Sequence, residues 1–179
     1  MKNISILLPY KENFSPLYAG AVSLYVKDTS FRSKYKNLIQ VFGNTNYKKT
    51  FQLNYVNIEM KKNRLKSGSK YYVENFLSYE KKLPSSIIEI HNRPIYLRYI
   101  SKHDLHSKIV LYFHNDPLTM NGSKTKQDRE FLLNFASKII FNSLWSKKRF
   151  LEKMDYTAIN SEKLIVIYQS ADKPNIDFK

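Results

Sequence analysis

Short apolar runs alternate with longer amphipathic stretches along almost the whole chain, and this alternation restricts the folds that the chain can adopt. Continuous apolar runs of about four to eight residues are typical of strands that are buried on both faces of a sheet. They predict strands at 4–8, 37–42, 51–58, 86–90, 108–113, 137–141 and 163–168.

The stretches between these runs carry apolar residues at helical spacing. They predict helices at 18–27, 61–83, 95–101, 128–136 and 144–154. Thr125 with Asp128 three residues later is a typical capping pair, and Ser143 is a typical N-cap residue. The alternation of strands and helices predicts an α/β fold, in which a Rossmann-like parallel β-sheet carries helices on both faces.

The composition is that of an ordinary folded domain. The 179 residues fit one domain, and a hydrophobic fraction of 42% is near the globular average. The chain has no cysteine, which excludes disulfides and thiol chemistry, and no spacing typical of metal ligands. We therefore expect no metal and no bound cofactor. No apolar run approaches the roughly 20 residues that a membrane-spanning helix needs, and we expect a cytoplasmic protein.

The chain is strongly basic, with a formal net charge of +15. Such a charge favours an anionic partner, either nucleic acid, an acidic membrane surface or a phosphorylated substrate. Lysine far outnumbers arginine, of which there are six, and Asn, Ile, Tyr and Phe are abundant. AT-rich codons produce this same composition, so a functional charge and a codon bias both remain open.

Two histidines end consecutive predicted strands in matched contexts, His91-Asn92-Arg93-Pro94 and His114-Asn115-Asp116-Pro117. The carboxyl ends of parallel strands meet at one edge of a sheet, where ligands bind. A neutral imidazole can donate or accept a hydrogen bond there, and it can stabilise charge on an oxygen. The alternative is that each histidine only caps its strand.

Gly20 follows the first strand and its loop, near the start of the first predicted helix. Backbone N–H groups at a helix N-terminus can hold a phosphate, and glycine lets it approach closely. The alternative is a glycine that helix packing alone requires.

Four lysines are candidates for contact with an anionic membrane surface. Two of them lie around the loop before the helix at 128–136, and the other two lie on the helix at 144–154. On the second helix, the rings of Trp145 and Phe150 would insert into the membrane while the lysines contact its headgroups. These lysines are Lys124, Lys126, Lys147 and Lys148. The alternative is an ordinary solvated basic face.

The order and spacing of these segments resemble the N-terminal domain of retaining glycosyltransferases of family 4, which have the two-domain GT-B architecture. The resemblance spans essentially the whole chain. It is carried by Ile4–Pro9 with Tyr18–Ala21, by Glu89–Pro94 and Tyr112–Pro117, by Ala136–Ser143 with Lys148–Phe150, and by Lys163–Asp172. The paired His-Asn strand ends resemble a bacterial branch of the family.

The resemblance implies roles for individual residues. Gly20 would help the phosphates of the donor to approach, and His114 would be catalytic, lying against the donor sugar and its diphosphate. The acceptor would be bound by His91, Asn92, Arg93, Asn115 and Asp116. The departures are Ala19 in place of a first glycine and Gln169-Ser170-Ala171 in place of an Asn-Gly-Val stretch.

The resemblance also implies a domain organisation. Residues 1–167 would form the acceptor-side domain and residues 168–179 the start of an interdomain linker, with the C-terminal donor-binding domain absent. The family's Glu-x(7)-Glu pair belongs to that domain and does not occur here. We expect a hexosyltransferase half that is inactive without a separate or missing donor domain.

The complete enzyme would transfer a sugar from a nucleotide-sugar to a glycan or lipid-linked acceptor in cell-envelope polysaccharide synthesis, peripherally on the inner membrane. The alternative is a non-enzymatic basic α/β module that binds nucleic acid or an anionic membrane surface. Nucleic acid is the less favoured partner, because the sequence has no helix-turn-helix or RNA-binding signature.

Overall fold

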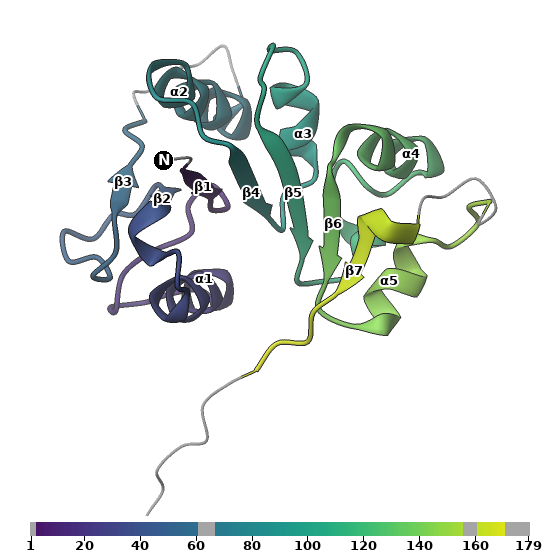
Figure 1. Cartoon of the computed structure of the whole chain (residues 1–179), viewed down its shortest axis with the longest axis horizontal. Helices are drawn as coiled ribbons and strands as arrows, with labels where there is room; N and C mark the ends of the chain where they lie inside the picture. Colours follow the sequence, from purple (N-terminus) through teal and green to yellow (C-terminus); the bar gives the residue numbers. More distant parts are fainter. Residues whose placement is uncertain (1–2, 61–66, 156–160, 171–179) are drawn as a thin grey trace, which may run out of the picture.

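The computed structural model describes residues 3–60, 67–155 and 161–170, and these residues form one parallel sheet of seven strands (Figure 1). The strand order is β3-β2-β1-β4-β5-β6-β7. The strands are β1 (Ile4–Leu7), β2 (Ile39–Gly43), β3 (Tyr55–Asn57), β4 (Ile87–His91), β5 (Lys108–Phe113), β6 (Lys138–Phe141) and β7 (Leu164–Val166).

The order of the strands creates a switch point in the middle of the sheet. From β1 the chain adds strands in one direction to β3, and it then crosses to β4 and adds strands in the other direction. The segments that follow β1 and β4 therefore diverge, and in doubly wound sheets such divergence opens a crevice beyond the carboxyl ends of the two strands. This is where doubly wound sheets bind their ligands.

Helices cover both faces of the sheet, as the sequence predicts (Figure 1). On one face, α1 (Ala21–Arg32) buries Val22 and Val26 against Ile6 and Val41. The opposite face holds the larger core cluster. It is covered by α2 (Gly68–Lys82), α3 (Ile95–Ile100), α4 (Lys126–Phe135) and α5 (Leu144–Phe150).

The predicted elements are all present, but several of their boundaries differ. The first helix begins after Gly20 because Tyr18 has a φ of 87°, which is not helical. The strand predicted at 51–58 is shorter, since only Tyr55–Asn57 pair with β2 at the sheet edge. The helix predicted at 144–154 ends at Phe150, and Lys153 has a φ of 61°. Residues 61–66 of the helix predicted at 61–83 lie outside the described residues, as do residues 171–179 of the predicted linker.

Two predicted caps are confirmed. Thr125 accepts from the backbone N–H of Asp128, and the Asp128 carboxylate accepts from the backbone N–H of Thr125, which completes a capping box for α4. Ser143 caps α5 by accepting from the backbone N–H of Ser146. Each cap satisfies an orphan N–H group at the start of its helix.

One buried carboxylate lies at the sheet end opposite the crevice. Glu80 is 2% exposed, and its oxygens accept from the Ser5 hydroxyl at 2.6 Å and from the backbone N–H of Ser85 at 2.9 Å. These bonds join the end of α2 to β1 and to the approach to β4. Glu80 therefore has a structural role, which explains its place on the otherwise apolar stripe of its helix.

The described residues include no helix that is both long and apolar enough to cross a membrane.

Candidate functional site

The two predicted histidines contact each other at the carboxyl edge of the sheet. His91 ends β4 and His114 follows β5, and the Nδ1 atom of His91 lies 2.9 Å from the Nε2 atom of His114. The rings are nearly parallel, with centroids 5.2 Å apart. The sequence predicted that both strand ends meet at this edge, and the structure places their side chains in direct hydrogen-bond contact.

The neighbours of the pair determine which nitrogen carries each proton. The side-chain amide nitrogen of Gln169 lies 2.6 Å from Nδ1 of His114. An amide nitrogen only donates, so this Nδ1 must accept. His114 then carries its proton on Nε2 and donates to Nδ1 of His91. In neutral His91 the proton is consequently on Nε2, the atom that lies 3.6 Å from the Glu89 carboxylate.

Aromatic rings enclose the histidine pair. Tyr112 stacks on His91 with ring centroids 4.4 Å apart, and Tyr25 from α1 meets His114 edge-on at 4.9 Å. Burial, and to a smaller extent a positive charge on His91, lower the pKa of His114 to about 3. His114 is therefore a neutral imidazole at physiological pH, able to donate and accept hydrogen bonds but unable to supply a positive charge.

Asn92 links the histidine pair to the surface beside it. Its backbone has a φ of 57°, a left-handed conformation that asparagine tolerates better than most residues. Its side-chain oxygen accepts from the backbone N–H of His114 at 3.3 Å, and its own N–H donates to Tyr112 O at 2.8 Å. Asn142, after β6, donates to His114 O at 2.8 Å. These bonds fix the turn that carries His114.

A pocket of about 470 Å³ opens on the other side of Asn92. Its walls come from the start of α2, the turn between β4 and α3, and the loop between β5 and α4. The lining residues are Ser69, Asn92, Arg93, Pro94, Ile95, Thr119, Met120, Asn121 and Lys124. Arg93 and Asn92 therefore line a pocket at the predicted acceptor side, whereas His91 is 1% exposed and does not.

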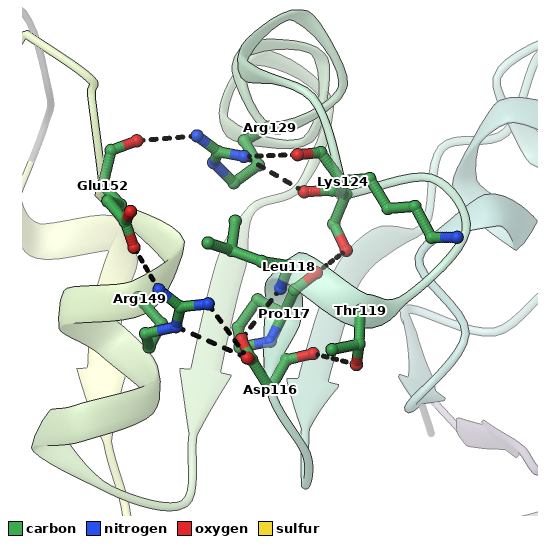
Figure 2. Close-up of polar contacts among 9 residues, drawn as sticks. Asp116, Pro117, Leu118, Thr119, Lys124, Arg129, Arg149 and Glu152 are labelled. Carbon is green, nitrogen blue, oxygen red and sulfur yellow. Dashed lines mark hydrogen bonds and ion pairs between the residues drawn. The ribbon is translucent and has the colours of Figure 1, made fainter.

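Asp116 and Asn115 do not line this pocket. Asp116 caps the 3-10 turn Pro117–Thr119 by accepting from the backbone N–H of Leu118 at 3.0 Å. Its carboxylate also pairs with Arg149 of α5 at 3.2 Å, and Arg149 pairs in turn with Glu152 (Figure 2). Asp116 thus shows a structural role, and Asn115 is exposed. Their predicted acceptor contacts stay predictions.

A buried arginine holds the loop that follows Asp116. Arg129 is 3% exposed and donates to Lys124 O at 3.0 Å and to Glu152 O at 2.7 Å (Figure 2). Its guanidinium therefore ties the loop at 116–125 to the end of α5. Arg129 was not among the predicted site residues, because a single basic residue inside a helix gives no sequence signal of burial.

The N-terminus of α1 already has a carboxylate against it. Glu12 accepts from the backbone N–H of Ser23 at 3.2 Å. A Cβ atom on Gly20 would lie only 2.0 Å from a Glu12 carboxylate oxygen, so Gly20 makes room for this side chain. Packing against Glu12 therefore explains why a glycine stands at position 20. The predicted contact of Gly20 with a donor phosphate remains a prediction, and it requires the Glu12 side chain to move aside.

The four predicted surface lysines differ in their surroundings. Lys124 and Lys148 are exposed, Lys126 pairs with Glu130 at 3.7 Å, and Lys147 donates to Leu164 O at 2.9 Å. The expectation that Phe150 dips into a membrane is wrong, since its ring is buried against the core of the sheet. The exposed apolar residues of α5 are Leu144 and Trp145, which are 56% and 58% exposed.

Sequence reasoning missed the residues that surround the histidine pair. Glu89, Tyr112 and Gln169 contact it directly, and Tyr25 reaches it from the other side of the crevice. Glu89 lies two residues before His91 on β4, and Tyr112 lies two residues before His114, which directly follows β5, so the period of two places each on the face of its histidine. That spacing was the available signal.

Comparisons with known proteins identify the fold. No family model matches the sequence, and no curated protein matches it. Among solved structures, Anabaena Alr3699/HepE in complex with UDP-glucose aligns with a TM-score of 0.62 and 15% identity, over 94% of this chain and 44% of that chain. A glycosyltransferase from Rickettsia africae ESF-5 aligns with a TM-score of 0.61 and 14% identity, over 96% of this chain and 44% of that chain.

An enzyme of another kind aligns as well. The UDP-N-acetylglucosamine 2-epimerase of Rickettsia bellii has a TM-score of 0.56 and 8% identity, over 93% of this chain and 44% of that chain. The chain spans less than half the length of these three structures. The likeness shows an α/β, Rossmann-like fold of the kind found in GT-B glycosyltransferases. Because an epimerase shares this fold, the fold alone does not identify the activity.

Proposed function

We propose that this chain is the acceptor-side half of a two-domain glycosyltransferase, of the bacterial, retaining family 4 type. The complete enzyme transfers a hexosyl group from a nucleotide-sugar to a glycan or lipid-linked acceptor in cell-envelope polysaccharide synthesis. The observation that carries the proposal is the position of His114, a neutral imidazole at the carboxyl end of β5, one strand away from the switch point, which Asn92 joins to a polar pocket.

His114 is the proposed catalytic residue. The transfer breaks the bond from the anomeric carbon to the diphosphate oxygen and joins that carbon to an acceptor hydroxyl oxygen. The hydroxyl proton leaves with the diphosphate. A neutral imidazole contributes by positioning the sugar through a hydrogen bond and by its dipole, because positioning and preorganised electrostatics supply much of the rate enhancement of enzymes.

His91 is the proposed orienting partner of His114. It is buried, it contacts His114 at 2.9 Å, and it lies between His114 and Glu89. His91 contacts Nε2 of His114, and Gln169 contacts its Nδ1. These two contacts together hold the His114 ring in one orientation and one tautomer. Arg93 and Asn92 form the wall against which the acceptor binds.

The proposed division of the chain follows from this role. Residues 1–167 form the acceptor-side domain, and residues 168–179 begin the linker to a donor-binding domain. The chain alone is then inactive. The nucleotide-sugar is a co-substrate, and no metal or other cofactor takes part in the proposal.

Peripheral contact with the cytoplasmic face of the inner membrane is the proposed location. The exposure of Leu144 and Trp145 on α5, beside the exposed Lys148, supports it. An apolar residue next to a cation suits the boundary between acyl chains and anionic headgroups. The same surface would serve the second candidate function, a non-enzymatic basic module on an anionic membrane.

Reconstitution of the two halves tests the proposed function. The chain is purified alone and also joined to the polypeptide that the reading frame downstream of Lys179 encodes. Release of UDP is measured from UDP-glucose and UDP-N-acetylglucosamine, with and without bacterial membrane extract as the source of acceptor. We expect no turnover by the chain alone and acceptor-dependent turnover by the joined halves.

His114→Ala should lower that turnover by about 100-fold or more, whereas His106→Ala, at an exposed histidine, should leave it unchanged. Turnover by the chain alone would refute its proposed inactivity. Conversion of the sugar without an acceptor would indicate an epimerase. Binding of RNA with a steep dependence on salt concentration, and no turnover, would favour the non-enzymatic module.

A further inference from the structure

The pocket beside Asn92 has an unbalanced charge. Arg93, from the turn between β4 and α3, and Lys124, from the loop between β5 and α4, both line it, and no carboxylate stands among the described residues that line it. Ser69, Thr119 and Asn121 add hydroxyl and amide groups. A concave surface that gathers cations without counter-charges concentrates positive potential and attracts anions.

The chain pairs other arginines internally. Arg98 lies 2.6 Å from the Asp128 carboxylate, and Arg149 lies 3.2 Å from Asp116. Within the described part of the chain, the guanidinium of Arg93 instead donates one hydrogen bond, to Asn92 O at 2.8 Å. Across the ranges 3–60, 67–155 and 161–170, neither Arg93 nor Lys124 forms an ion pair with a carboxylate. Four of the five N–H donors of a guanidinium thus remain for a ligand.

The two walls are held at a fixed spacing. Gly122, with a φ of 94°, packs so closely on the start of α3 that a Cβ atom there would lie 2.5 Å from Ile95 N. This contact presses the loop of Lys124 against the turn of Arg93. Arg129 anchors the same loop from inside through Lys124 O. The cations are therefore carried by backbone that is already in place, which lowers the entropy cost of binding.

We propose that this pocket binds the phosphate or diphosphate group of an acceptor. The binding groups come from three separate elements, and a phosphate offers oxygens in three dimensions, whereas a carboxylate offers two in one plane. The identification of the anion as part of the acceptor rests on the proposed function, because Asn92 joins the pocket to His114. The existence of the anion site does not rest on it.

Titration of the full chain with small anions tests the site. Binding of pyrophosphate, glucose 6-phosphate, glucuronate and UDP is measured by calorimetry and by NMR shifts of the Arg93 and Lys124 amides. Arg93→Gln and Lys124→Gln each remove one cation from the pocket. Lys108→Gln is the matched control, since Lys108 is exposed at the opposite edge of the sheet.

We expect each pocket variant to bind pyrophosphate and glucose 6-phosphate about tenfold more weakly, the effect of losing one charge-assisted contact, and the control to bind as the wild type does. Equal losses in all three variants would show a non-specific charge effect and would overturn the site. Glucuronate binding as tight as that of glucose 6-phosphate would overturn the assignment to phosphate. UDP binding with the same dependence on Arg93 and Lys124 would overturn the assignment to the acceptor.

Two further arms distinguish a soluble acceptor from a lipid-linked one. Vesicles that contain polyprenyl phosphate are compared with phosphatidylglycerol vesicles of equal charge. Retention by the former that Arg93→Gln and Lys124→Gln abolish indicates a lipid-linked phosphate, and a preference for glucose 6-phosphate in solution indicates a soluble one. Retention that neither variant changes would count against the pocket. His114→Ala should leave phosphate binding intact while lowering transfer by the joined halves about 100-fold or more, which separates failure of the site from failure of the proposed function.

Discussion

Replacing His114 with glutamine should make the protein less sensitive to acid. Burial lowers the pKa of His114 to about 3 in the folded protein, and a positive charge on His91 acts in the same direction. In the unfolded chain the pKa of a histidine is about 6.5. Below that pH the unfolded state binds a proton that the folded state does not, so the free energy of unfolding falls as the pH falls from about 6.5 towards 3.

The expected size follows from the two pKa values. Each unit of pKa corresponds to about 1.4 kcal/mol, so the loss between pH 7 and pH 4.5 is about 2.5 kcal/mol for a fully buried ring. His114 is only half-buried, and solvent screens part of the effect. We therefore expect the wild type to lose about 1–2 kcal/mol more than His114→Gln over this interval. Glutamine keeps a donor and an acceptor but does not titrate.

Urea unfolding followed by the fluorescence of Trp145 measures this difference at pH 7 and pH 4.5. The carboxylates contribute equally to both proteins, so the difference between the two pH profiles isolates His114. His106→Gln is the control, because His106 is exposed and should leave the profile unchanged. Parallel profiles for the wild type and His114→Gln would refute the reasoning, as would an NMR titration of the His114 ring with a midpoint near pH 6.5.

Three further predictions concern single contacts. Glu80→Gln should lower the free energy of unfolding by about 2 kcal/mol in urea titrations. The Glu80 carboxylate accepts from the Ser5 hydroxyl and from the Ser85 N–H, and in glutamine the amide nitrogen would replace one of the two accepting oxygens. Glu130→Gln is the control, because Glu130 is exposed. Thr125→Ala should cost about 1 kcal/mol in the same assay through loss of the α4 cap, and an unchanged value would contradict the capping box. Ring ¹⁵N shifts should show both His91 and His114 protonated on Nε2 at pH 7. Gln169→Leu should weaken that preference in both rings, because the proton position in His91 follows from that in His114, and an Nδ1-protonated His114 in the wild type would contradict the assignment.

The sheet could be predicted from sequence because its strands are buried on both faces. A run such as Ile109–Phe113 is almost continuously apolar, and each run is followed by polar residues where the strand ends. The boundaries that differ are set by other forces. The β3 strand pairs on one side only, so little of the predicted run at 51–58 is held in the ladder. The start of α1 depends on Glu12, which lies in another segment.

The candidate site could be predicted only in part, because sequence shows where strands end but not which polar groups satisfy one another. His91, His114, Asn92 and Arg93 do lie at one edge, as the strand ends required. The sequence does not indicate that Asp116 forms an ion pair with Arg149, because the two residues are 33 positions apart. Long-range polar pairing of this kind decides which polar side chains at the strand ends remain for a ligand.

The charges at the crevice favour an acceptor over a donor as the ligand of this half. A departing nucleoside diphosphate needs positive charge, and His114 is held neutral by burial. The N-terminus of α1, the other place where a phosphate could bind, faces the Glu12 carboxylate, whose negative charge opposes that of a phosphate. Among the described residues, Arg93 and Lys124 have no carboxylate partner, and they line the pocket that Asn92 joins to His114. Under the proposed function, neutralisation of the leaving group therefore falls to the donor half, and this chain contributes orientation of the sugar and an anion-binding acceptor wall.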